Sequence, residues 1–132
     1  MSLVSAIRVL SVDDHDILRK GLVEVIELFD DLQLVGEASN GKRAIELCAD
    51  LRPDVILMDL VMPEMDGVAA TQIIRQNYPD IQVIALTSFE EEKLIQEAKQ
   101  AGVYTYLLKN VSIDELADAI RSAYRGRPAF ST

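Results

Sequence analysis

The feature that most constrains the fold is a regular alternation between short apolar runs and longer amphipathic stretches, which occurs five times along the 132 residues. The apolar runs are nearly continuous, as in IRVLSV and VILM, which is typical of strands that are covered on both faces. We therefore predict strands at residues 7–12, 33–38, 55–58, 83–86 and 104–108. The stretches between them repeat apolar residues at helical spacing, so we predict helices at residues 15–29, 42–50, 68–77, 90–101 and 113–124.

Strands that alternate with helices pair in parallel through right-handed crossovers. Five such units are too few for an eight-stranded barrel. We therefore predict an α/β fold, a flavodoxin-like doubly wound (βα)5 unit whose five-stranded parallel sheet has the strand order 2-1-3-4-5. In such a sheet, ligands bind beyond the carboxyl ends of the strands, close to the switch between the first and third strands.

Charge and composition exclude several classes of function. The chain has 13 Lys and Arg against 22 Asp and Glu, a net charge of −9, which disfavours direct binding to nucleic acid. No apolar stretch approaches the roughly 20 residues of a membrane helix, so we expect no membrane partner. With one cysteine, Cys48, and no export signal, we expect a cytoplasmic protein.

The expected domain organisation is simple. Residues 1–6 form an N-terminal extension, residues 7–125 form one domain, and residues 126–132 begin a linker, because Gly126 and Pro128 interrupt the last helical pattern. Within the domain, Asp66 and Ser112 are expected to cap the third and fifth helices, and Gly102 to end the fourth.

Three carboxylates follow strands that should be neighbours in the sheet. Asp13 and Asp14 come after the first strand, and Asp59 comes after the third. A cluster of carboxylates is tolerable where a hard cation lies among them, and a site with few oxygen ligands suits Mg²⁺. The alternative is that Asp13 or Asp14 only caps the first helix. The convergence of all three residues favours a Mg²⁺ site.

The same edge gains groups that can bind phosphate. Thr87 and Ser88 end the fourth strand, and Lys109 follows the fifth. A carboxylate can attack a phosphoryl group, while a hydroxyl and an ammonium group stabilise the phosphoryl oxygens. Taken one at a time, a Thr at the end of a strand is usually an ordinary strand residue, and a Lys after a strand is usually a solvated cation. The combination indicates phosphoryl chemistry.

These residues, together with the segment MDLVMPEMDG, resemble the receiver domain of two-component response regulators. The resemblance covers nearly the whole chain, and the segment DDHDILRKGL further resembles the NarL/FixJ, or LuxR-type, subfamily. It implies that Asp59 accepts a phosphoryl group from a sensor histidine kinase. It also implies that Asp14, Asp59 and the backbone carbonyl of Val61 bind Mg²⁺, with Asp13 acting through water, and that Lys109 pairs with the phosphoryl group.

The resemblance further implies a conformational switch. Thr87 would move toward the phosphoryl group, with Ser88 beside it, while the ring of Tyr106 turns inward. The expected outputs are phosphorylation-dependent homodimerisation and DNA binding through a C-terminal helix-turn-helix domain that this sequence does not contain. Asn110 departs from the family pattern, which usually has a proline with a cis peptide bond at this position.

Two other classes of function remain open. The first is an Mg²⁺-dependent phosphatase of the haloacid-dehalogenase type, which needs a general acid two residues after the nucleophile, where this chain has Val61. The second is a binding module with the same fold and no phosphoryl chemistry.

Val61 and Phe89 are apolar at positions that, in the family, influence the access of hydrolytic water. We therefore expect a lengthened phosphoryl lifetime.

Overall fold

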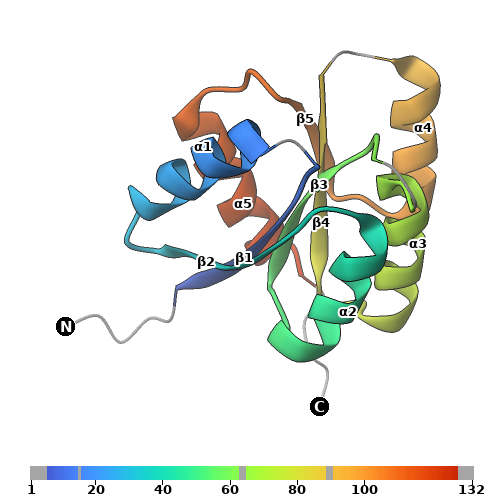
Figure 1. Cartoon of the computed structure of the whole chain (residues 1–132), viewed down its shortest axis with the longest axis horizontal. Helices are drawn as coiled ribbons and strands as arrows, with labels where there is room; N and C mark the ends of the chain where they lie inside the picture. Colours follow the sequence, from blue (N-terminus) through green and yellow to red (C-terminus); the bar gives the residue numbers. More distant parts are fainter. Residues whose placement is uncertain (1–5, 15, 63–64, 89–90, 128–132) are drawn as a thin grey trace.

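The computed structural model describes residues 6–14, 16–62, 65–88 and 91–127, with the backbone alone for residues 16–20. The predicted sheet is confirmed: five parallel strands lie in the order β2-β1-β3-β4-β5 (Figure 1). The strands are β1 (Ile7–Val12), β2 (Leu32–Ala38), β3 (Val55–Asp59), β4 (Gln82–Thr87) and β5 (Thr105–Leu108). The helices are α1 (Asp16–Glu27), α2 (Gly41–Leu51), α3 (Gly67–Asn77), α4 (Glu92–Ala101) and α5 (Ile113–Arg125).

Two helix boundaries differ from the expected ones by two residues: α4 begins at Glu92 where the pattern predicts residue 90, and α1 ends earlier than predicted. The sequence pattern extends this helix to residue 29, whereas α1 ends at Glu27. The backbone N–H groups of Leu28 and Phe29 donate to carbonyls only three residues earlier, at 3.1 and 3.2 Å, so the chain tightens into a turn. The apolar periodicity continues through that turn because Phe29 still packs on the core.

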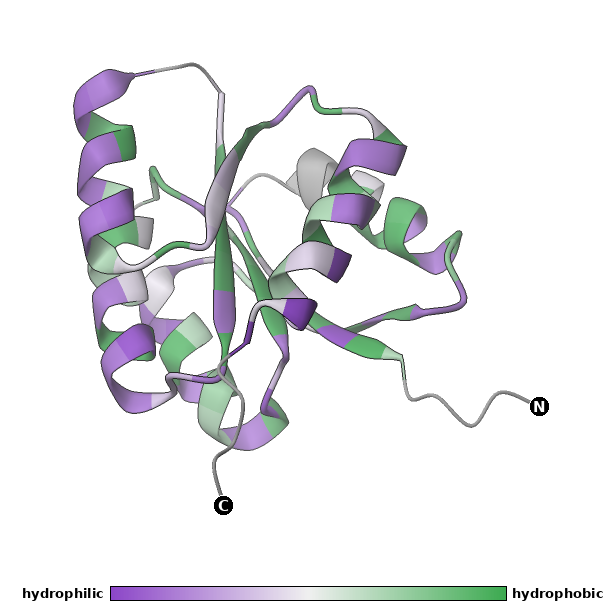
Figure 2. Ribbon diagram, turned by 180° about the vertical axis from the view of Figure 1, so that it is seen from behind, coloured by the Kyte–Doolittle hydropathy of each residue, from purple (hydrophilic) through white to green (hydrophobic). Residues whose placement is uncertain are grey.

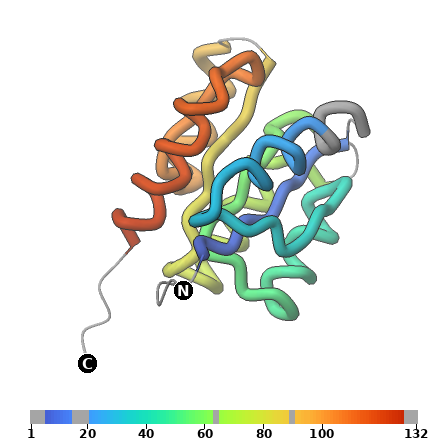
Figure 3. Tube along the Cα trace, turned by 90° about the vertical axis from the view of Figure 1, so that its left-hand side faces the viewer, coloured from blue at the N-terminus to red at the C-terminus, as the bar shows by residue number. Residues whose placement is uncertain are grey.

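The helices cover the sheet on both faces. Helices α1 and α5 lie on one face, and α2, α3 and α4 lie on the other (Figures 1 and 3). The strands are mostly apolar along their length, whereas the helices are apolar only toward the sheet (Figure 2). Burial of β3 and β4 on both faces explains why their sequences show no polar alternation.

The helix ends agree with the caps that the sequence predicts. The side chain of Asp66 accepts a hydrogen bond from the backbone N–H of Ala69 at 2.8 Å. The side chain of Ser112 accepts one from Glu115 at 3.1 Å. Gly102 ends α4 with φ at 108°, a left-handed conformation that favours glycine. These caps determine where α3 and α5 begin relative to the sheet.

A close approach of backbones positions the loop after β3. The N–H of Gly67 donates to the carbonyl of Leu60 at 3.2 Å, and a Cβ at Gly67 would collide with the backbone carbonyl of Asp59. The N–H of Gly41 donates to the carbonyl of Met65 at 3.1 Å. The segment after Asp59 is thus held from both ends, beside the carboxyl end of β1.

Among the described residues, none of the helices has both the length and the apolar character required to span a bilayer.

Candidate phosphoacceptor site

The structure brings the three carboxylates together at the carboxyl edge of the sheet. Each of Asp13, Asp14 and Asp59 offers one oxygen, and these oxygens lie within 4.8 Å of one another. Asp13 is 1% exposed and Asp59 2% exposed, whereas Asp14 is exposed to solvent. They meet because β1 and β3 are adjacent parallel strands in register, Val12 being paired with Met58. The cluster therefore opens to solvent on the side of Asp14.

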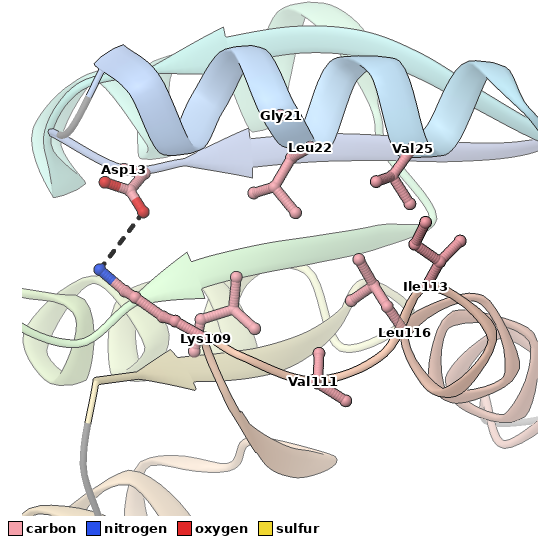
Figure 4. Close-up of a pocket in the computed structure, with 9 residues that line it drawn as sticks. Asp13, Gly21, Leu22, Val25, Lys109, Val111, Ile113 and Leu116 are labelled. Atoms are coloured by element: carbon pink, nitrogen blue, oxygen red, sulfur yellow. Dashed lines mark ion pairs between the residues drawn. The ribbon is translucent and has the colours of Figure 1, made fainter.

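Lys109 brings a positive charge to the two buried carboxylates. Its Nζ lies 3.1 Å from Oδ2 of Asp59. The same Nζ lies 3.4 Å from Oδ2 of Asp13 (Figure 4). The backbone N–H of Lys109 donates to the carbonyl of Thr87 at 2.8 Å, which anchors the end of β5 against β4. The ammonium group is thus held between two carboxylates that come from different strands.

The electrostatics of Asp59 reflect competing influences. Burial raises its pKa above the ordinary value, because desolvation penalises the carboxylate. The N–H of Val61, which donates to Oδ1 of Asp59 at 3.1 Å, and the ammonium of Lys109 act in the opposite direction. Ionisation of Asp59 therefore costs more in this fold than it does in water.

The donor set fits a hard divalent cation. Three carboxylates and one ammonium group leave an excess of negative charge, and carboxylate oxygens are preferred ligands of Mg²⁺. The loop at Val61 turns back on Asp59 through its N–H. The side chain of Val61 is 62% exposed, so an apolar group faces solvent beside the cluster. The residues expected to bind the metal are therefore neighbours.

The expected switch residues lie at the end of β4 and on β5. Thr87 is buried at the end of β4, and Ser88 after it is exposed. Tyr106 is half-buried on β5, where it packs on a small cluster that includes Leu60 and Ala98. Its ring centroid lies 6.0 Å from the Nζ of Lys99, a residue of α4. Tyr106 therefore belongs to the face covered by α4.

Several contacts could not be found from the sequence. The expectation for Lys109 concerned the phosphoryl group, and its pairing with Asp13 is additional. In the sequence, the arginines near the end of α5 look like a basic patch, and the helix dipole is a sufficient explanation for cations at this position. The structure instead gives two of them specific partners: Arg121 pairs with Asp31 at 2.7 Å, and Arg127 pairs with Asp54 at 2.8 Å. Opposite charge was the only available signal, and it does not select partners that are about 70 to 90 residues apart.

Two remaining sequence expectations concern local features. The peptide bond between Lys109 and Asn110 is trans, as are the other peptide bonds of the described residues. Phe89, expected to influence access of water, lies outside the described residues.

Comparison with protein-family models matches residues 9–121 to the response regulator receiver domain. The chain belongs to this family. It is 46% identical over 125 residues to the response regulator protein VraR of Staphylococcus epidermidis, a match that covers 95% of this chain and 60% of that protein. The VraR of Staphylococcus aureus gives 46% identity over 124 residues, 94% of this chain and 59% of the relative. The receiver domain therefore spans about 60% of the length of these curated relatives.

Solved structures agree with the family. The signal receiver domain of NarL from Mycobacterium tuberculosis matches with a TM-score of 0.89 and 32% identity, over 94% of this chain and all of that chain. A LuxR-family DNA-binding response regulator from Staphylococcus aureus matches with a TM-score of 0.83 and 30% identity, over 89% of this chain and 98% of that one. These neighbours support the NarL/FixJ, LuxR-type resemblance and the flavodoxin-like fold.

Membership of the family defines the general role of the receiver domain. Receiver domains are regulatory switches of two-component systems and not classical enzymes, and they act with a sensor kinase. The family binds Mg²⁺ at acidic residues, and among the described residues the cluster of Asp13, Asp14 and Asp59 fits such an ion.

Proposed function

We propose that this receiver domain is a phosphoacceptor switch in which Asp59 accepts a phosphoryl group from a sensor histidine kinase in a Mg²⁺-dependent reaction. The observation that carries the proposal is the position of Asp59. Its buried carboxylate lies beside two other carboxylates and 3.1 Å from the ammonium of Lys109. This arrangement supplies a nucleophile, ligands for a cation and a positive charge for the phosphoryl oxygens.

The transfer is a displacement at phosphorus. A carboxylate oxygen of Asp59 forms a new bond to the phosphorus, and the bond between phosphorus and the donor breaks. The donor, a histidine nitrogen of the kinase or the acetate of acetyl phosphate, leaves with the electron pair. Lys109 starts between Asp13 and Asp59 and would move its charge onto the phosphoryl oxygens as they arrive.

The metal ligands in this proposal are Asp14, Asp59 and the backbone carbonyl of Val61, with Asp13 acting through water. When bound, Mg²⁺ neutralises charge on the phosphoryl oxygens during the transfer. Asp14 is the exposed member of the cluster, so it lies where an ion arrives from solvent.

Phosphorylation would change the domain through contacts that differ between the two states. Thr87, with Ser88 after it, would bind the phosphoryl oxygens, and Tyr106 would turn toward the space that the Thr87 hydroxyl vacates. Tyr106 packs on the cluster between β5 and α4, so its rotation would alter the surface of α4, β5 and α5. This surface change is the proposed route to homodimerisation.

Transcriptional output is proposed for the longer protein. Residues 7–125 would form the receiver domain, residues 1–6 an extension and residues 126–132 the start of a linker to a helix-turn-helix domain. The LuxR-family relatives support this organisation. DNA binding would belong to that further domain, because the receiver carries a net charge of −9. The cytoplasmic location stays a prediction.

The test is intact mass spectrometry after incubation with acetyl phosphate, with and without Mg²⁺. We expect the wild type to gain one phosphoryl group only with Mg²⁺, and Asp59→Asn to gain none. Asp50→Asn, a matched change at an exposed position of α2, should label like the wild type. Labelling of Asp59→Asn would show that another residue is the acceptor and would contradict the proposal.

The competing functions give different results in the same experiment. Steady consumption of a phosphate ester without an adduct would favour the phosphatase. No adduct and no consumption by a folded protein would favour the binding module. The exposed apolar side chain of Val61 supports the switch, because Val61 cannot serve as the general acid that the phosphatase needs. The apolar character of Val61 also supports the proposed long phosphoryl lifetime, which Val61→Asn and Phe89→Glu should shorten.

A further inference from the structure

A cavity of about 220 Å³ lies between α1 and α5, next to the carboxylate cluster (Figure 4). Two kinds of residue line it. Most of its walls are apolar, and the side chains that form them include Leu22, Val25, Leu86, Val111 and Leu116. One end is polar, because Asp13 and Lys109 also line the cavity and face each other there at 3.4 Å.

We propose that this cavity binds a small, neutral aromatic molecule of about two fused rings that carries one hydrogen-bond donor. Apolar walls with a few convergent polar groups are the usual composition of a small-molecule site. A cavity of about 150 Å³ lined by aliphatic side chains is large enough to bind benzene. The cavity between α1 and α5 is larger, so it has room for a second ring.

The polar end of the cavity selects the charge of the ligand. Lys109 is shared between Asp13 and Asp59, so the carboxylates there outnumber the ammonium group. Without Mg²⁺, a carboxylate or phosphate on the ligand would be repelled by this excess of negative charge. A cationic ligand would have to leave water for apolar walls, which is costly. A neutral N–H or O–H group can donate to the carboxylate of Asp13 at no such cost.

Gly21 provides a way to close the cavity without disturbing its walls. It lies on the α1 side of the cavity, and a Cβ added there would meet no atom within 4 Å. Gly21 is also inside a helix, where replacement by alanine is favourable by about 0.5 to 1 kcal/mol. We therefore expect Gly21→Leu to occupy part of the cavity, whereas Gly21→Ala is the matched control that should leave it open.

The test is a titration of the wild-type chain with indole, followed by the methyl NMR signals of Val25, Val111 and Leu116, without Mg²⁺ or phosphodonor. We expect saturable shifts at these methyl groups. Benzofuran, which has the same shape without the donor, should bind more weakly, and indole carboxylate more weakly still. Gly21→Leu should weaken indole binding by about tenfold or more. Gly21→Ala should bind like the wild type.

The proposal would be overturned by shifts that do not saturate, by shifts confined to other parts of the protein, or by equal binding by Gly21→Leu and the wild type. Shifts of the same methyl groups on raising protein concentration without indole would show that a second copy covers the cavity, and would also overturn it. The thermal midpoint of each variant confirms folding. The result is independent of phosphoryl transfer, because binding is measured without a phosphodonor.

Discussion

Carboxylates at the two edges of the sheet differ in how many positively charged partners they have. At the amino edge, Asp54 accepts hydrogen bonds from the backbone N–H of Arg8 at 2.9 Å and from the guanidinium of Arg127 at 2.8 Å. At the carboxyl edge, Asp13 and Asp59 share the single ammonium of Lys109, and Asp14 lies beside them. The charge of Asp54 is thus balanced by Arg127, whereas the three carboxylates at the carboxyl edge outnumber the ammonium of Lys109.

This difference separates a structural role from a functional one. A carboxylate with its own guanidinium partner stabilises the fold, and its charge is already neutralised, so it binds a cation weakly. Carboxylates that share one cation repel each other, and a divalent ion relieves that repulsion. We therefore expect changes at the carboxyl edge to depend on Mg²⁺ and changes at the amino edge not to depend on it.

The largest expected effect comes from removing the shared cation. Lys109→Met leaves Asp13 and Asp59 buried without its charge, and we expect the free energy of unfolding to fall by about 3 kcal/mol at neutral pH without Mg²⁺. Saturating Mg²⁺ should restore part of the loss. Urea denaturation measures both values. Lys93→Met, at an exposed position of α4, should change stability by less than about 0.5 kcal/mol. An equal loss with and without Mg²⁺ would remove the proposed distinction between the edges.

The next effect is a gain of stability in Asp59→Asn. Burial raises the pKa of Asp59, so the ionised carboxylate is a cost at neutral pH, and its removal should raise the free energy of unfolding by about 1 to 2 kcal/mol without Mg²⁺. The gain should appear as the pH rises above the ordinary carboxyl pKa of about 4, and vanish below it. Urea denaturation as a function of pH measures it. A loss of stability at neutral pH would contradict this view of the site.

At the amino edge, Arg127→Met should lower the free energy of unfolding by about 1 kcal/mol. The guanidinium bonds Asp54 at 2.8 Å and lies 4.0 Å from the ring centroid of Tyr124. A double-mutant cycle with Asp54→Asn measures the coupling, and Mg²⁺ should leave it unchanged. Coupling that responds to Mg²⁺ would mean that the two edges are linked.

The smallest effect is expected for the exposed pair of Asp31 and Arg121. The hydrogen bond from Arg121 holds the pKa of Asp31 below its ordinary value. The contribution of the pair is present above the ordinary carboxyl pKa and is lost as the pH falls through the lowered value. Asp31→Asn should cost at most about 0.5 kcal/mol, and less at high salt. Denaturation at low and high salt measures this cost. A cost that does not depend on salt would indicate that the packing of Arg121 against the ring of Phe29 is disturbed instead.

Most of the fold could be predicted because its signals are local. Apolar runs such as VILMD mark strands, helical periodicity marks helices, and the residues Asp66 and Ser112 mark helix starts. The end of α1 was predicted two residues late, because Phe29 continues the apolar pattern into a turn. The gathering of Asp13, Asp14 and Asp59 at one edge also follows from the sequence, once parallel strands are assumed.

The sequence by itself thus determined which elements form, their order in the sheet and which residues reach its carboxyl edge. Only the tertiary structure decided that Lys109 is shared between Asp13 and Asp59, that Arg127 pairs with Asp54, and that a cavity separates α1 from α5. The physical reason is the sequence distance over which each kind of interaction acts. Periodicity and capping act within a few residues, whereas ion pairs and cavities depend on how side chains distant in the chain pack in three dimensions.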